Sequence, residues 1–167
     1  MKDIEDVRLL LKEAFADVRI DKSRDQTEPS HEDCIQLRDD LCVLEEIDLK
    51  WYLPRVLEDL LDNRTNDPME SKYACFVLTH LNVDNYTSEK YFRYYAELFG
   101  EDAVHRMKED NAQQSVYSKK RFSIFDKKQA YAIYEWFELA LTWWSDSEDC
   151  EDDLKGAIDY WKQLAFE

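Results

Sequence analysis

Residues 126–144, DKKQAYAIYEWFELALTWW, decide the fold predicted for this chain. Asp126 and Gln129 stand three residues apart, which is the spacing of a capping box at a helix start. Apolar side chains then recur every three or four residues, which is the period of one helix face. The segment therefore predicts a long aromatic helix with one buried face. The predicted stripe consists of Ile133, Trp136, Phe137, Ala140, Leu141 and Trp144.

Similar apolar spacing predicts helices on both sides of this segment. A first helix is expected over residues 3–18, and a last one through 154–164 after a loop at 145–149. A weaker helix is expected over 102–114. Residues 121–125 alternate polar and apolar side chains, so a short extended piece could precede the capped helix. The other predicted helix starts lie at Ser30, Asp48, Asp67 and Tyr86–Ser88.

Glycine and proline mark where these helices bend or end. Pro54 has no amide proton and crowds the preceding turn, so a kink or a restarted helix is expected there. Gly100 can take the left-handed conformation that closes a helix. The whole chain has two Gly and three Pro, too few for the many tight turns of a sandwich or barrel. The 167 residues therefore predict one all-α domain, 1–167, of about seven or eight helices in an irregular bundle or a solenoid-like stack.

The charge of the chain is strongly unbalanced. Asp and Glu number 38 against 22 Lys and Arg, which gives a formal net charge of −16. Five Trp, ten Tyr and eight Phe supply ample mass for a core, so the sequence indicates a folded acidic domain and not a disordered tail. A partner of such a domain is expected to be basic.

Several classes of chemistry lack their usual residues in this sequence. Glycine occurs only at positions 100 and 156, so no phosphate-binding loop or dinucleotide turn is expected. His31, His80 and His105 lie far apart and the cysteines form no C-x-x-C pair, which argues against zinc. Neighbouring acids such as Asp39 and Asp40 diverge by about 100° around a helix, so they do not converge on one ligand. We expect no cofactor, no metal and no enzymatic activity.

The sequence also bears on where the protein works. No stretch reaches the length of a bilayer span, and the N-terminal residues show no signal-peptide core. Four scattered cysteines without such a signal indicate reduced thiols. The expectation is a cytoplasmic protein without membrane contact.

The first candidate contact surface is the acidic stretch at 146–153, which holds six acids in eight residues beside two tryptophans. Acids next to large flat side chains suit binding to a basic protein. The same acids could instead solvate the start of the last helix, where the helix dipole favours negative charge. The predicted contact residues here are Trp143, Asp146, Glu148, Asp149, Glu151, Asp152 and Asp153.

A second candidate surface lies within residues 28–70, where thirteen acids face four bases. These acids could line one side of two neighbouring helices and match a basic groove, although a solvated polar face explains them equally well. The basic island at 119–128 is not expected to bind nucleic acid, because an acidic molecule repels phosphate at long range. The second set consists of Asp39, Asp40, Glu45, Glu46, Asp59 and Asp62, with Glu58 beside them.

Two segments, DLKWYLP at 48–54 and RFSIFDKKQ at 121–129, resemble a bacterial family of small helical domains of unknown function. The resemblance covers about residues 35–140, and Phe125 replaces the family's usual Leu. It carries over no catalytic residues. In general character the chain is also similar to immunity proteins of contact-dependent and polymorphic toxin systems. This likeness implies a cognate toxin domain as partner, a nuclease with a basic cleft; the alternative is a cytoplasmic helical adaptor without catalytic activity.

Overall fold

The computed structural model describes residues 2–20, 27–41, 43–63, 72–83, 89–144 and 148–167. Within these ranges the regular structure is helical and no strand occurs, so the predicted all-α class is confirmed. The helices are α1 (Ile4–Ala14), α2 (His31–Asp40), α3 (Glu46–Asp62), α4 (Lys72–Leu81), α5 (Glu89–Phe99), α6 (Glu101–Phe122), α7 (Lys127–Trp144) and α8 (Glu148–Phe166).

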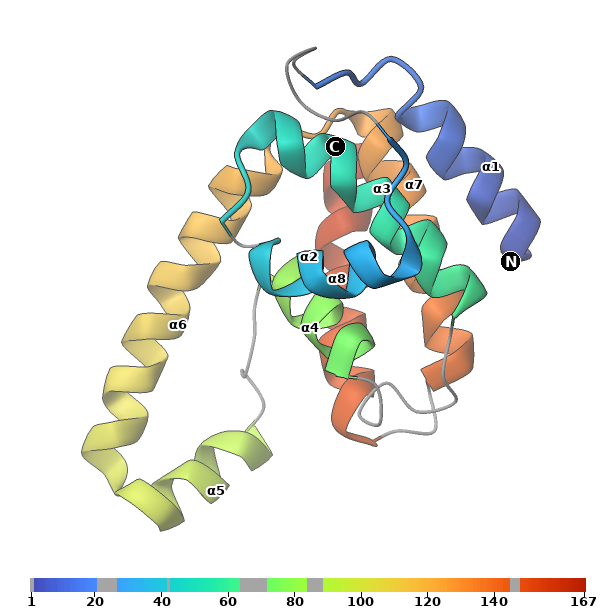
Figure 1. Ribbon diagram of the computed structural model, residues 1–167. Helices are drawn as coiled ribbons and strands as arrows, with labels where there is room; N and C mark the ends of the chain where they lie inside the picture. Colours follow the sequence, from blue (N-terminus) through green and yellow to red (C-terminus); the bar gives the residue numbers. More distant parts are fainter. Residues whose placement is uncertain (1, 21–26, 42, 64–71, 84–88, 145–147) are drawn as a thin grey trace.

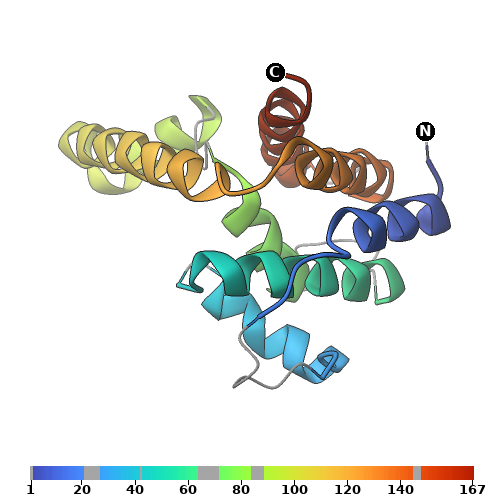
Figure 2. The ribbon, with the colours of Figure 1, turned by 90° about the horizontal axis from the view of Figure 1, so that it is seen from above.

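Helix α7 lies at the centre of the bundle. It packs along α8 on one side and against α1 on another, while α3 packs on α1 and α2 (Figure 1). Seen from above, α7 and α8 run side by side over α1 and α3, and α2 lies below them (Figure 2). Helix α6 extends away from this body and carries α5 at its far end (Figure 1). One apolar cluster, drawn from α1, α2, α3, α4, α7, α8 and the last turn of α6, forms the core.

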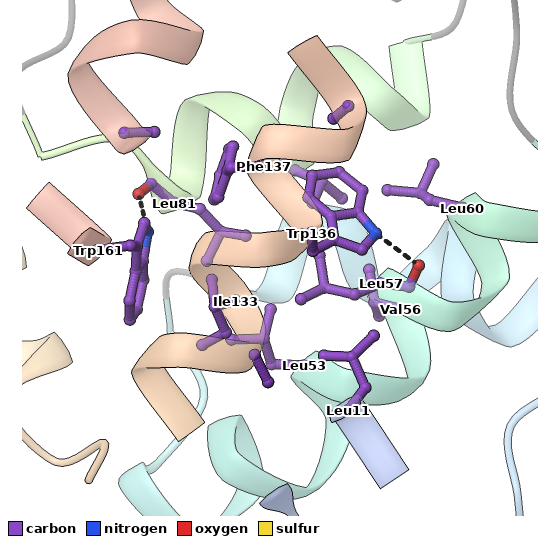
Figure 3. Packing of buried hydrophobic residues seen from close by; sticks show 14 of the residues in the cluster. Leu11, Leu53, Val56, Leu57, Leu60, Leu81, Ile133, Trp136, Phe137 and Trp161 are labelled. Atoms are coloured by element: carbon purple, nitrogen blue, oxygen red, sulfur yellow. Dashed lines mark hydrogen bonds between the residues drawn. The ribbon is translucent and has the colours of Figure 1, made fainter. Parts of the chain in front are cut away.

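Two buried tryptophans join helices that are far apart in the sequence. The indole Nε1 of Trp136 in α7 donates to the Leu57 carbonyl of α3 at 3.0 Å. The indole Nε1 of Trp161 in α8 donates to the Leu81 carbonyl at the end of α4 at 3.1 Å (Figure 3). Both tryptophans are fully buried. Each therefore supplies a large apolar area and also satisfies its one polar group inside the core.

The capping boxes expected at two helix starts are confirmed. The Asp126 carboxylate accepts from the Gln129 amide at 2.8 Å, and the Gln129 side chain accepts from the Asp126 amide at 3.3 Å. Ser30 and Asp33 make the reciprocal pair at the start of α2. Most of the predicted stripe of α7 is buried, and Leu141 is half-buried against the core.

Helix α3 differs from its prediction at the start and in the middle. The helix begins at Glu46 with Glu45 as its N-cap, so Asp48 lies inside the first turns, where it is buried. No restart occurs at Pro54, because α3 continues through it to Asp62 and its C-cap is Asn63. Core packing compensates for the lost backbone bond, since Leu53, Val56 and Leu57 around the proline are fully buried.

The region from 101 to 125 also differs from its prediction. Helix α6 is not a weak helix ending near 114, since it continues to Phe122 and is followed by a turn at 123–125. The expected extended piece is absent from these described residues. Phe122 and Phe125 are both buried, and Phe122 packs on Trp161 at 5.1 Å between ring centroids. The last turn of a helix followed by a tight turn can thus give the same alternation of polar and apolar residues as a β-strand.

Three other boundaries are now defined. Helix α1 ends at Ala14 and not near 18, although Phe15 and Val18 still reach the core. Helix α8 already includes Glu148, within the expected loop. Gly100 has a φ of 84°, so the expected positive φ is confirmed, and this residue forms the corner between α5 and α6. The predicted starts at Asp67 and at Tyr86–Ser88 lie outside the described residues.

Candidate protein-binding surface

The acidic side chains of the first predicted surface lie outside the part of the chain that the structure describes. Asp146 lies outside the described residues, and the side chains of residues 148–153 are likewise not described, although their backbone forms the start of α8. Trp143 is half-buried, and its ring centroid lies 6.1 Å from that of Trp144 in an edge-on contact. A surface at 146–153 therefore stays a prediction.

The structure divides the second predicted surface into two parts. Asp40, Glu45 and Glu46 lie at the corner between α2 and α3, whereas Asp59 and Asp62 lie near the other end of α3. Thirteen residues of helix separate Glu46 from Asp59, which corresponds to about 20 Å along the axis. The side chain of Asp39 is outside the described set. The described acids of this set therefore fall into two groups, one at each end of α3.

Asp59 and Asp62 line a cleft between α1 and α3 with a volume of about 760 Å³. The floor of the cleft is apolar and includes Phe15, Trp51 and Pro54. Its α1 wall carries the basic residues Arg8 and Lys12. This arrangement places the acids of α3 directly opposite cations of the same chain.

Those acids are engaged within the molecule. The Arg8 guanidinium donates to both carboxylate oxygens of Asp62, at 2.6 and 3.2 Å. The Asp59 carboxylate lies 2.8 Å from Nδ1 of His31 and also accepts from Asn63 at 3.0 Å. The cleft acids therefore have less negative charge to offer a partner than the sequence suggests.

Glu58 has a different environment within the same cleft. Its nearest cation is Lys12, with Nζ at 3.8 Å from the carboxylate. Burial raises the pKa of the Glu58 carboxyl, and the positive charge of Lys12 opposes this shift only in part. Arg55 is held nearby by Glu28 at 2.6 Å and stacks 3.4 Å above the Trp51 ring. Ion pairs thus line the cleft beside its buried apolar residues.

The corner between α2 and α3 offers a different combination of side chains. Leu41 and Leu44 turn toward the core, and their carbonyls accept from the Arg121 guanidinium of α6. Val43 and Ile47 point outward, with exposed fractions of 73% and 44%. We call the exposed residues here the acidic corner, which consists of Asp40, Val43, Glu45, Glu46 and Ile47.

The described residues of the acidic corner are held by backbone hydrogen bonds. The amides of Val43 and Leu44 both donate to the Asp40 carbonyl, at 2.8 and 3.1 Å, and the Leu49 amide donates to the Glu45 carbonyl at 2.8 Å. The Arg121 bonds fasten the same turn to the end of α6. Two exposed apolar side chains close in sequence to three exposed acids form a surface suited to protein binding.

The apolar half of this surface was missed by sequence reasoning. The apolar stripe of this region runs through Leu41 and Leu44, and Val43 and Ile47 fall outside it. The signal in the sequence was that these two apolar residues lie outside the predicted buried stripe and next to the paired acids Glu45 and Glu46. Their exposure depends on where α2 ends and α3 begins, which only the folded chain shows.

Comparisons with known proteins do not assign the chain to a family. No family model matches the chain, and neither the curated proteins nor the solved structures include a match. Across the described residues, no three His, Cys, Asp or Glu side chains are grouped as metal ligands would be. None of the described helices combines the length and the apolar character needed to cross a bilayer.

Proposed function

We propose that this chain is a cytoplasmic immunity protein that binds the toxic domain of a cognate bacterial toxin and blocks its active site. We propose a nuclease as the toxin domain, because the active cleft of a nuclease must hold phosphates and is therefore basic. A basic cleft suits an acidic inhibitor. The observation that carries the proposal is the acidic corner, where exposed Val43 and Ile47 stand among Asp40, Glu45 and Glu46. The net charge of −16 supports it, because it attracts a cationic partner from a distance.

The mechanism is stoichiometric binding. Long-range electrostatic attraction accelerates the encounter with the toxin domain. Val43 and Ile47 then slow dissociation, because their apolar surface is buried from water in the complex. Because the attraction is between solvent-exposed charges, salt screens it at distances beyond the Debye length, which is about 8 Å at physiological ionic strength. The association rate is therefore expected to fall steeply with salt, and an association rate independent of salt would exclude this mechanism.

The test uses the full chain and the product of the gene that neighbours its own. Co-expression is expected to rescue growth, and the triple variant Asp40→Lys, Glu45→Lys, Glu46→Lys is expected to lose at least about tenfold in affinity, because like charges then face the basic cleft. The matched control changes Glu13, Asp17 and Glu32 to Lys, which alters net charge equally at exposed positions elsewhere.

Three outcomes separate the possibilities. Loss of binding in the corner variant with retention in the control supports the acidic corner as the contact. Equal losses in both variants would mean that net charge alone acts, and unchanged binding in the corner variant would remove the corner from the proposal. Failure of the wild-type chain to bind the toxin or to rescue growth would instead favour the adaptor function.

A further inference from the structure

Helix α6 is the most exposed long element of the described chain. Its 22 residues span about 33 Å, and only the last turns reach the core, through Ser118 and Phe122. The rest projects from the body with α5 packed near its start (Figure 1). Between Glu101 and Tyr117 the only buried residue is Val104.

The covered and exposed sides of α6 lie opposite each other. Positions 104, 107, 111, 115, 118 and 122 are buried or half-buried, recur at helical spacing and share one face, which the half-buried positions 103 and 121 flank. The opposite face carries a second series at the same spacing, in which every residue is exposed. We call it the outer stripe, and it consists of Asp102, Arg106, Glu109, Gln113, Val116, Tyr117 and Lys120.

The outer stripe includes apolar side chains that water does not favour. Val116 is 69% exposed and Tyr117 is 53% exposed, and at the α5–α6 corner Leu98 and Phe99 are 54% and 62% exposed. Helices in proteins obtain most of their stability from packing, and isolated helices are marginal in water. A projecting helix with exposed apolar residues near both ends is therefore suited to being covered by a partner.

The charge of this region selects the partner. Residues 89–122 contain seven Lys and Arg and six Asp and Glu, which gives this region a net charge of +1. The whole chain has a net charge of −16, so the residues outside this region have a net charge of −17. Two copies of the chain repel each other over most of their surface, and this repulsion is weakest where their α5–α6 regions meet. We propose that the outer stripe of α6 binds the outer stripe of a second copy in an antiparallel, two-fold symmetric contact.

The order of charges along α6 fits an antiparallel contact. Residues 101–111 hold four acids and two bases, whereas residues 112–122 hold three bases and no acid. A two-fold axis that crosses α6 near Asn111 places Lys120 of one copy opposite Asp102 of the other. It also places Tyr117 beside Arg106, where ring and guanidinium can stack. A two-fold contact makes each of these pairs twice.

Salt separates this contact from the proposed toxin binding. Repulsion between two copies of charge −16 is long-range, so moderate salt screens it more than it screens the close pairs at the interface. Self-association is therefore expected to strengthen from low to physiological salt, whereas toxin binding weakens. The self-association does not depend on the immunity function, so either proposal can fail alone.

Sedimentation velocity of the full chain over a wide concentration range tests the contact. The wild-type chain is expected to form a dimer, and the double variant Val116→Ser, Tyr117→Ser is expected to raise the dissociation constant at least about tenfold. Leu9→Ser is the control, because Leu9 is 56% exposed on α1. A chain that stays monomeric at every concentration and salt would overturn the proposal, and so would a dimer that the double variant leaves unchanged.

Charge reversal tests the pairing itself. Lys120→Asp and Asp102→Lys are each expected to weaken the dimer, since each places like charges opposite one another. An equimolar mixture of the two variants is expected to form a heterodimer, and the chain with both changes is expected to recover self-association. Lys162→Asp and Asp159→Lys on α8 are exposed controls of equal charge change. A mixture that stays monomeric would overturn the antiparallel register.

Discussion

Replacing Trp161 by Phe is expected to destabilise the protein more than replacing Trp136 by Phe. Both side chains are fully buried, and both donate one hydrogen bond to a backbone carbonyl of another helix. The acceptors differ. Leu81 is the last residue of α4, where helix carbonyls have no partner inside the helix, whereas Leu57 lies a full turn before the end of α3.

The magnitude follows from the atoms removed. Phe has three fewer side-chain heavy atoms than Trp, so either change loses about 2 kcal/mol of apolar burial at about 0.8 kcal/mol per methylene-sized group. In Trp161→Phe the buried Leu81 carbonyl also loses its indole donor, which adds about 1 to 2 kcal/mol. In Trp136→Phe the Leu57 carbonyl keeps its bond within α3, so the added cost is about 0.5 kcal/mol. The expected difference between the variants is about 1 kcal/mol.

Urea unfolding followed by far-ultraviolet circular dichroism measures this difference, provided that the m-value is unchanged. Phe166→Leu is the control, because Phe166 is 62% exposed and its replacement is expected to shift stability by less than about 0.5 kcal/mol. Equal losses for the two tryptophan variants, or a larger loss for Trp136→Phe, would refute the assignment of the Leu81 carbonyl as dependent on the indole.

Three further predictions concern titration and backbone. Burial raises the pKa of the Glu58 carboxyl, so the folded state holds this proton more tightly than the unfolded state does. The free energy of unfolding is therefore expected to fall as pH rises from about the ordinary pKa of 4.5 through the raised pKa. Glu58→Gln is expected to remove this slope from pH-dependent unfolding curves. Burial also raises the pKa of Tyr160 to about 12, so Tyr160→Phe is expected to remove a late step from an ultraviolet absorbance titration, and an unchanged titration curve would contradict this. Gly100→Ala is expected to cost about 1 kcal/mol in thermal unfolding through backbone strain alone, because φ is 84° and no atom lies within 4 Å of an added Cβ; a neutral result would mean that the α5–α6 corner relaxes.

Much of the helical order was predictable because caps and apolar periods are local. The box at Asp126 and Gln129 and the stripe of α7 depend on residues a few positions apart, and the structure confirms both. Predictions that rested on weak local signals were wrong at the boundaries. Asp48 has the side chain of a good cap, yet the helix starts at Glu46 and Asp48 is buried in its first turn.

The candidate site was predictable only in part. The exposure of Asp40, Glu45 and Glu46 agrees with their acidic character. The pairing of Asp62 with Arg8, 54 residues away, could not be read from either segment, because it requires α1 to lie against α3. From the sequence alone Asp62 is expected to be available to a partner, whereas in the fold its carboxylate is already paired with Arg8.

The sequence by itself determined that this chain is helical, acidic and rich in aromatic core residues, since those properties come from composition and from spacings within one or two turns. Tertiary structure alone decided which acids remain exposed, that Val43 and Ile47 stand among them, and that α6 projects with an uncovered face. The physical reason is that exposure and charge pairing depend on contacts between helices, and residue spacing along one helix does not specify which other helix will cover it.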